Sequence, residues 1–333
     1  MIKAMRIHEN GGPEVLKWEE IELPPPGDGE ARIRHTAIAL NFSDVNVRRG
    51  GFYIANPLQF PVILGNEAAG VVESVGPGVT EVKPGDRVAY VGVNAPFYEK
   101  TGSYAEQRNV PASCLIKLPD GVSERQAAAL MLKGLTASLV INRNFKPTPG
   151  DTILIHAATS GVGTILSQWS KHLGATVIGT VGSQEKAEIA KANGCDHTIL
   201  YRETDFVPEV KKIVPEGVSA VFDGVGKDTF IPSFDCTRPF GWLVNYGNAS
   251  GHVPPVDILL LAKKGSLIIT RPAYSTHVAV PAERDAACAE LFDLVKQGVL
   301  KVESGTTYAL KDAEQAHRDL EARKTVGSVV MIP

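Results

Sequence analysis

Seven residues, AATSGVG at 157–163, have the types and spacing of a loop that binds a phosphate-containing ligand. They follow an apolar run, TILIH, and precede a stretch in which apolar residues recur at helical spacing. A strand, a tight turn of small residues and a helix together expose backbone N–H groups to which a pyrophosphate binds. Ala158 and Ser160 stand at the first two glycine positions of GxGxxG, so the residues alone also fit an ordinary tight turn. The strand–turn–helix context favours a dinucleotide-binding loop.

The next strand along the chain distinguishes between the two nicotinamide dinucleotides. A site for NAD usually carries Asp or Glu at the end of this strand, where the carboxylate accepts hydrogen bonds from the ribose 2′-OH. Here TVIGTVGS, residues 176–183, contains no carboxylate, and Lys186 and Tyr201 follow it. A cation and a phenol suit a 2′-phosphate, so we interpret the site as one for NADP(H). Lys186 also fits a second role, as a solvated residue in the first turn of a helix capped by Ser183.

Composition limits the class of protein. A chain of 333 residues exceeds what one hydrophobic core usually organises, which favours two domains. A net charge of −3 gives no reason to expect nucleic acid or an anionic membrane as a partner, and no apolar run approaches the length of a membrane span. The four cysteines form no CxxC pair and the eight histidines show no HxxxH or HExxH spacing, so we expect a cytoplasmic protein without a metal site.

The elements that must hold the loop follow from the order of turns and apolar runs. Up to about Pro119 short strands alternate with turns such as PPPGDGE and KPGD, which predicts a strongly bent β-barrel. A helix is expected from Ser123 onwards, and beyond it six apolar runs alternate with helical stretches, which predicts a doubly wound parallel sheet covered on both faces. After Arg271 two helices and a final strand, SVVMIP, are expected to pack on the barrel, with the substrate cleft between the two domains.

In order along the chain, these pieces resemble the medium-chain dehydrogenase/reductase superfamily, and within it the zinc-free quinone oxidoreductases related to zeta-crystallin. The resemblance covers nearly the whole sequence. It implies an α/β fold in which 1–132 and 272–333 form a GroES-like β-barrel catalytic domain and 133–271 form an NADPH-binding Rossmann domain with a doubly wound parallel sheet. The segments that carry the resemblance are NFSDVNVRRG, GNEAAGVVESVGPGV, KPGDRVAY, LKGLTAS, HAATSGVG, GTVGSQEKA, FDGVG, NYGNASG, LIITRPA, LKDAEQAH and LEARKTVGS.

The resemblance also bears on metal. Zinc enzymes of the superfamily hold the catalytic ion with a cysteine, the histidine of GHE and a second cysteine; the matching positions here are Asn41, Asn66 and Lys133, a set unsuited to zinc. An alcohol needs a Lewis acid to ease loss of its proton as hydride leaves. A quinone already accepts hydride readily, so positioning and a few hydrogen-bond donors suffice. The resemblance thus implies metal-free reduction of quinones by direct hydride transfer from NADPH.

Site residues follow from the same resemblance, residue by residue. We expect Asn41, Asn46 and Tyr53 to orient the substrate; relatives usually carry a tyrosine at the position of Asn46. Without the resemblance, Thr136, Tyr246 and Arg271 would each be interpreted as structural. The residues expected to contact the cofactor are Asn41, Lys133, Thr136, Ser160, Gly161, Val162, Gly163, Gly182, Ser183, Lys186, Tyr201, Tyr246, Asn248, Arg271 and Arg323.

Two alternatives to quinone reduction stay open at this point. The first is NADPH-dependent reduction of α,β-unsaturated aldehydes or ketones at the C=C bond, which the same fold and cofactor support. The second is a nucleotide-binding structural or RNA-associated protein without important turnover, against which the acidic balance of the chain argues. The resemblance also implies a homodimer, formed by edge pairing of the strand SLIIT.

Overall fold

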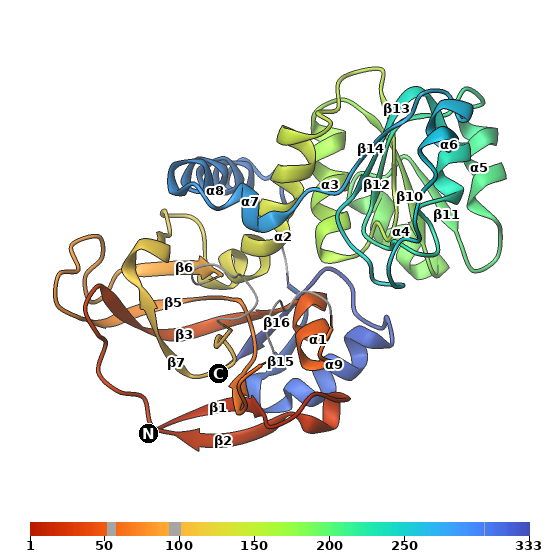
Figure 1. Cartoon of the computed structure of the whole chain (residues 1–333). Helices are drawn as coiled ribbons and strands as arrows, with labels where there is room; N and C mark the ends of the chain where they lie inside the picture. The colour runs from red at the N-terminus through yellow and green to blue at the C-terminus, as the bar shows by residue number, and fades with distance from the viewer. Residues whose placement is uncertain (52–57, 93–100, 303) are drawn as a thin grey trace. The chain divides into compact units, whose positions relative to one another are not determined.

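The computed structural model describes residues 1–51, 58–92, 101–302 and 304–333 (Figure 1). The chain divides into two compact units: unit 1 comprises 1–132, 288–296 and 302–333, and unit 2 comprises 133–287 and 297–301. Residues 272–287, which the sequence analysis assigned to the barrel domain, are part of unit 2 in this division. There Glu283 forms an ion pair with Arg143 at 2.6 Å. The domain boundaries expected from the sequence stay a prediction.

Unit 2 contains the predicted parallel sheet. All of its neighbouring strands pair in parallel, and their order is β11-β10-β9-β12-β13-β14, so the chain reverses its direction of winding between β9 and β12. The central strands are almost wholly apolar because both faces of the sheet are covered. The strands are β9 (Thr152–Ile155), β10 (Thr176–Val181), β11 (His197–Leu200), β12 (Val218–Asp223), β13 (Thr237–Asn245) and β14 (Ile268–Thr270).

Four helices of unit 2 begin at residues whose side chains cap them. Ser160, Ser183, Asp205 and Asp257 each accept a hydrogen bond from a backbone N–H of the first turn, as N-caps do. Figure 1 shows α3 on one side of the sheet and α5 and α6 on the other. The elements are α3 (Gly161–His172), α4 (Gln184–Ala192), α5 (Phe206–Ile213), η3 (Pro232–Cys236), α6 (Ile258–Lys263) and α7 (Tyr274–His277); α2 (Glu124–Arg143) and α8 (Pro281–Lys296) run from one unit into the other.

Unit 1 has the expected β architecture. A seven-stranded sheet follows the order β15-β16-β3-β5-β6-β8, with β7 also paired to β3, and a three-stranded sheet has the order β2-β1-β4. Register shifts in the β3–β5 pair bend the larger sheet around one apolar core. The strands are β1 (Ile2–Ile7), β2 (Lys17–Ile21), β3 (Glu30–Leu40), β4 (Val62–Ile63), β5 (Glu67–Val75), β6 (Arg87–Val91), β7 (Gln107–Pro111), β8 (Ile116–Lys117), β15 (Ser304–Ala309) and β16 (Ser328–Ile332).

Two helices and three short 3-10 turns complete unit 1. Helix α1 (Phe42–Arg48) follows β3 directly, and α9 (Ala313–Glu321) lies between β15 and β16 in the chain. The turns are η1 (Pro13–Val15), η2 (Ala112–Cys114) and η4 (Leu310–Asp312). The final strand SVVMI pairs with β3, so the tail of the chain completes the first sheet, as the sequence predicts. Among the described helices, none has both the length and the apolar character that a membrane span requires.

Candidate functional site

The loop between β9 and α3 has the geometry of a phosphate cradle. Ala157 adopts a left-handed φ of 54°, which turns the chain sharply at the end of the strand. The side chain of Ser160, which is exposed, accepts a hydrogen bond from the backbone N–H of Gly163 at 3.1 Å. A Cβ atom at Gly163 would lie 2.3 Å from the carbonyl oxygen of Ala157, so only glycine fits there. This close approach of helix to strand is the role of the third glycine in dinucleotide-binding loops.

A compensating glycine lies opposite the loop. The methyl group of Ala158 stands at the first glycine position of the motif and contacts β10, where a Cβ at Gly179 would lie 2.7 Å from it. The missing glycine of the loop is thus replaced by a glycine on the neighbouring strand. Since the two residues are far apart in sequence, the loop pattern alone does not show this exchange.

His156, which was not among the residues expected from the sequence, stabilises the same turn through hydrogen bonds to neighbouring elements. It is fully buried at the end of β9; its Nδ1 lies 3.1 Å from Thr180 Oγ1 and its Nε2 lies 2.9 Å from Ser233 Oγ. Ser233 donates to the carbonyl oxygen of Thr229, so it accepts from Nε2–H, and Thr180 donates to Nδ1. Thr180 Oγ1 in turn accepts from the backbone N–H of Ala157. Burial lowers the pKa of His156, so the ring stays neutral within this series of hydrogen bonds.

The residues expected around a 2′-phosphate gather in part. Ser183 caps α4 by accepting from the N–H of Lys186 at 3.3 Å, and Tyr201 is partly exposed. A Cβ at Gly182 would lie 2.9 Å from Tyr201 Oη and 3.4 Å from Arg202 Nε, so the end of β10 meets both side chains. Arg202 is a cation that the sequence analysis missed; its place beside Tyr201 was the only available signal. Arg323 belongs to unit 1, where it is exposed and has a left-handed φ of 58° just after α9.

Tyr246 has an unusual environment in unit 2. Its hydroxyl is buried and has no hydrogen-bond partner within the described part of the chain. Burial and the nearby Asp223 raise its pKa, so the hydroxyl keeps its proton. A Cβ at Gly224 would lie 2.7 Å from the Tyr246 ring, which therefore rests on the backbone after β12. A buried donor without an acceptor is what a site that awaits a polar ligand would present.

The remaining residues expected on the nicotinamide side lie on three segments of unit 2. Asp223, at the end of β12, accepts from the N–H groups of Val225 and Gly226 and so shapes the turn after that strand. Arg271 follows β14 and donates to the carbonyl oxygen of Asn245 at 2.9 Å. Asn248, after β13, is partly buried, as is Thr136 on α2, whereas Lys133, also on α2, is buried.

Unit 1 carries residues expected to orient the substrate, at the start of α1. Asn41 is 6% exposed and its Nδ2 donates to Glu67 Oε1 at 2.7 Å, while Glu67 Oε2 accepts from the backbone N–H of Leu132 at 2.6 Å. Asn66 donates to Asp44 Oδ1 at 3.4 Å, and its own side-chain oxygen is buried without a partner among the described residues. The side chains at positions 41 and 66, which the resemblance matched to zinc ligands, are both amides, and that of Asn41 donates to a carboxylate.

The substrate residues expected from the sequence are described only in part. Asn46 lies on α1 and is partly exposed. Tyr53 lies outside the described residues. Within residues 1–51, 58–92, 101–302 and 304–333, no group of three or more His, Cys, Asp or Glu side chains is arranged to hold a metal ion.

Comparison with known proteins gives matches along the whole chain. Residues 27–120 match the family "Alcohol dehydrogenase GroES-like domain" and residues 161–286 match the family "Zinc-binding dehydrogenase". The chain is 44% identical to a 2-haloacrylate reductase of Burkholderia, covering 100% of this chain and 99% of the relative. It is 42% identical to a quinone oxidoreductase of Pseudomonas aeruginosa over 100% of both chains. The crystal structure of Escherichia coli quinone oxidoreductase complexed with NADPH superposes with a TM-score of 0.92 at 40% identity, over 99% of this chain and 100% of that one.

Proposed function

The chain belongs to the medium-chain dehydrogenase/reductase superfamily, and we propose that it is an NADPH-dependent reductase that passes hydride directly to quinones without a metal ion. The proposal rests on two features, one in each unit. In unit 2 a cradle closed by Gly163 accepts no side chain. In unit 1, Asn41, which the resemblance matches to a zinc ligand of other family members, donates a hydrogen bond to Glu67.

The cofactor preference is supported by the end of β10. This strand ends without the carboxylate that would bind a ribose 2′-OH, and its last residues meet Tyr201 and Arg202. Lys186 in the first turn of α4 adds a second cation. Side chains that donate hydrogen bonds or carry positive charge favour the binding of a phosphate dianion. A carboxylate at the same place would repel that dianion.

The fit to a dinucleotide can be followed along the site. The N–H groups at the start of α3 would hold the pyrophosphate, Gly182 and Ser183 the adenosine ribose, and the unpartnered hydroxyl of Tyr246 a polar group on the nicotinamide side. When bound, NADPH supplies the hydride from its nicotinamide ring. The protein then has to hold the acceptor and donate hydrogen bonds to the oxygen that gains charge, which is the role proposed for Asn41 and Asn46. Solvent supplies the proton.

Steady-state kinetics test the proposal. Purified protein is assayed with NADPH against a panel of benzoquinones and naphthoquinones, with NADH as the comparison donor. We expect turnover with NADPH and a much lower kcat/KM with NADH. Failure to reduce any quinone of the panel would reject the proposed quinone reductase activity. Tight NADPH binding without turnover of any acceptor would favour the structural or RNA-associated role instead.

A second candidate function has its own support. The 44% identical relative is named a 2-haloacrylate reductase, and its substrate class carries an activated C=C bond. Asn46, shorter than the tyrosine usual at this position, leaves a different substrate environment on α1. We propose reduction of α,β-unsaturated carbonyl compounds as the alternative activity. The ratio of kcat/KM values for quinones and for 2-alkenals or 2-haloacrylate decides between the two.

We also propose that the protein forms a homodimer through the edge of the unit 2 sheet. Strand β14 ends the strand order, and Ile268 on it is 38% exposed. Nearby on the chain, Phe240 is 72% and Ile258 70% exposed, which is unusual for large apolar side chains. Light scattering is expected to give twice the mass of the chain, and Ile268→Lys is expected to yield the monomer; a wild-type monomer at assay concentration rejects the proposal.

A further inference from the structure

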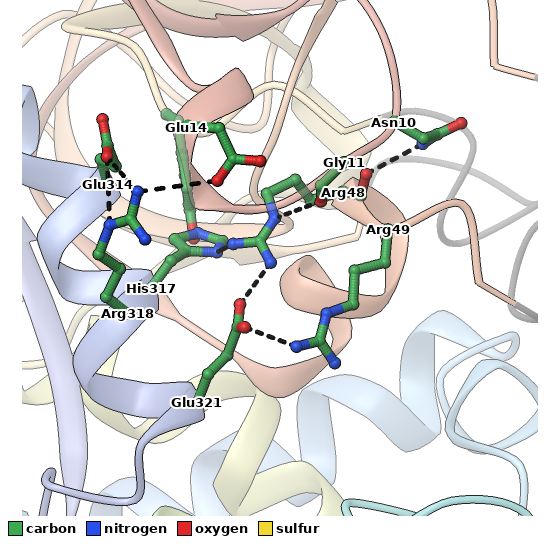
Figure 2. Close-up of polar contacts among 10 residues, drawn as sticks. Asn10, Gly11, Glu14, Arg48, Arg49, Glu314, His317, Arg318 and Glu321 are labelled. Atoms are coloured by element: carbon green, nitrogen blue, oxygen red, sulfur yellow. Dashed lines mark hydrogen bonds and ion pairs between the residues drawn. The ribbon is translucent and has the colours of Figure 1, made fainter.

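A fully buried arginine anchors the end of α1 that lies furthest from Asn41. Arg48 has no exposed surface, and its guanidinium donates to three groups: the carbonyl oxygen of Gly11, a carboxylate oxygen of Glu321 and the ring of His317 (Figure 2). The second oxygen of Glu321 accepts from the exposed Arg49 at 2.6 Å. A buried cation is tolerated only with such partners, because an unpaired one would lose its hydration without return.

The arginine fixes the hydrogen on His317. A guanidinium only donates, so His317 Nδ1, 3.1 Å from Arg48 Nη1, must accept, and the ring proton is on Nε2. Burial, together with the charge of Arg48, lowers the pKa of His317 to about 3, which keeps the ring neutral. Nε2–H then faces the hydroxyl oxygen of Tyr104 at 3.2 Å.

Tyr104 connects His317 by hydrogen bonds to Asp44, near the start of α1. Since its oxygen accepts from His317, its O–H is directed to Asp44 Oδ2 at 3.2 Å. The hydroxyl is fully buried, and burial and Asp44 raise its pKa well above the ordinary value, so it remains a donor. Asp44 Oδ2 also accepts from the backbone N–H of Asn41 at 2.9 Å. Donation therefore runs in one direction from Arg48 through His317 and Tyr104 to Asp44, and Asp44 accepts from Asn41 on its other side.

The series ends on the amide whose orientation matters for the proposed reaction. Asn41 is held at its backbone and at its side chain: its backbone N–H donates to Asp44, its Nδ2 donates to Glu67 at 2.7 Å, and its side chain takes part with Asp44 in a capping box. Because the amide is planar, one fixed bond from Nδ2 together with a fixed backbone sets the plane in which its oxygen and nitrogen lie. Loss of the Tyr104 hydroxyl would remove one donor from Asp44 while the backbone N–H of Asn41 and Nδ2 of Asn66 remain, so we expect the carboxylate to shift towards these two groups.

We propose that His317 and Tyr104 are positioning residues for Asn41: they hold, through Asp44, the amide that orients the hydride acceptor. The inference rests on the proposed function for the role of Asn41 in the reaction. Neither side chain needs to touch the substrate, and neither was selected from the sequence. Their effect is on where the amide points, so they should change turnover more than cofactor binding.

The chain offers a matched control for the test. Tyr90 is a second fully buried tyrosine of unit 1, and its hydroxyl lies 3.0 Å from Nε2 of the buried His35, whose Nδ1 bonds the carbonyl oxygen of Ala105 at 2.7 Å. Tyr104→Phe and Tyr90→Phe thus delete the same atom from the same kind of pair. We expect similar falls in Tm for both. Only Tyr104→Phe is expected to lower kcat for the acceptor, by roughly tenfold or more, with a smaller change in KM for NADPH.

A readout independent of activity separates the inference from the proposed function. In protein labelled with ¹⁵N-asparagine, the side-chain NH₂ signals of Asn41 are assigned by their loss in Asn41→Asp. We expect Tyr104→Phe to shift these signals and Tyr90→Phe to leave them in place. If the signals shift but the wild type reduces no acceptor, the proposed function fails while the positioning of Asn41 stands. If the signals are unchanged in Tyr104→Phe, the inference is overturned whatever the activity.

A pair of substitutions at His317 guards against simple misfolding. His317→Gln places an amide N–H near the position of Nε2 and restores the donor to Tyr104, whereas His317→Leu removes it. The glutamine variant is expected to regain most of the kcat and the wild-type Asn41 signals. Equal loss in both variants, with both folded by thermal unfolding, would show that the ring supports the core alone and would overturn the inference.

Discussion

The side chain of Ser160 accepts a hydrogen bond from the backbone N–H of Gly163, 3.1 Å away, and the two residues thereby close the turn on which the cofactor site depends. The bond caps α3 and draws its first turn over the end of β9. Gly163 can take this place only because it has no side chain, since a Cβ would lie 2.3 Å from the Ala157 carbonyl oxygen. The backbone N–H of Ser160 donates to the Ala157 carbonyl oxygen, so the N–H groups of Gly161 and Val162 are left to face a ligand.

Gly163→Ala is expected to open this turn. The added methyl group must displace backbone rather than a flexible side chain, so we expect a loss of about 1–3 kcal/mol in the free energy of unfolding. NADPH affinity is expected to fall by roughly tenfold or more, measured by quenching of protein fluorescence. Asp205→Ala, which removes the cap of α5, is the control: it should lower stability by about 1 kcal/mol without changing NADPH affinity. Unchanged affinity in Gly163→Ala would contradict the assignment of the loop.

Charge reversal at Lys186 tests the choice between NADPH and NADH. Lys186→Glu is expected to weaken NADPH binding by roughly 10- to 100-fold while NADH binding changes little, because only NADPH places a dianion there. Lys191→Glu is the matched control: it lies on the same helix and pairs with Glu188 at 3.0 Å. The two dissociation constants are measured by calorimetry for each variant. Equal losses for both cofactors would remove Lys186 from the phosphate site, and Arg202→Glu would be the next variant to measure.

Removal of the unpartnered Tyr246 hydroxyl is expected to stabilise the free protein and to reduce the stabilisation that bound NADPH provides. Tyr246→Phe removes a buried polar atom that has no acceptor in the described structure, so the free protein is expected to gain about 1 kcal/mol of stability. The increase in Tm that NADPH produces should become smaller, because the bound ligand loses a hydrogen bond. Thermal unfolding with and without NADPH measures both effects. An unchanged increase would place the ligand away from this hydroxyl.

Buried neutral histidines predict that stability falls as the solution becomes more acidic. Burial lowers the pKa of His35 to about 4 and that of His317 to about 3, and it lowers the pKa of His156 as well. Unfolded histidines titrate near their ordinary pKa of about 6.5, so below that pH the unfolded state binds more protons and is favoured. Stability is therefore complete above about pH 6.5 and is lost towards the folded pKa, by at most about 1.4 kcal/mol per pH unit for each group.

Urea unfolding at pH 7, 6 and 5 measures this dependence. The carboxylates whose pKa values are lowered, such as those of Asp151 and Asp196, stay ionised across that range and add little to the slope. His35→Gln should reduce the dependence of the free energy of unfolding on pH by the contribution of one histidine. A stability that does not vary from pH 7 to pH 5 would contradict the neutral, buried state of these rings.

Much of the fold was predictable because its signals are local. Apolar runs between turns predicted the six strands of unit 2, and the N-cap at Ser183 followed from a serine ahead of helix-forming residues. The GroES-like barrel followed from short strands between glycine- and proline-rich turns, helped by the resemblance to a known superfamily. These features depend on residues within one or two turns of one another.

The residues that the sequence did not reveal act over long separations. Tyr104 and His317 are 213 positions apart in the chain, and Arg48 and His317 are 269 apart. No spacing rule connects such residues, because the sheet rather than the sequence brings them together. His156 was hidden for a related reason: it begins a recognised loop but works through Thr180 and Ser233, on other elements. The expectation for Tyr53 stays a prediction.

Strand β16 occupies an inner place in its sheet. Strand β16 pairs with β3 on one side and with β15 on the other, although β3 lies near the start of the chain. On the ribosome, the part of β3 that pairs with β16, Ile38–Leu40, must therefore keep an open edge until Ser328–Ile332 have emerged, long after residues 133–287. Open strand edges pair readily with other chains. Translation is thus the period in which this protein is most exposed to aggregation, and a chain that stops before Ser328 never leaves it.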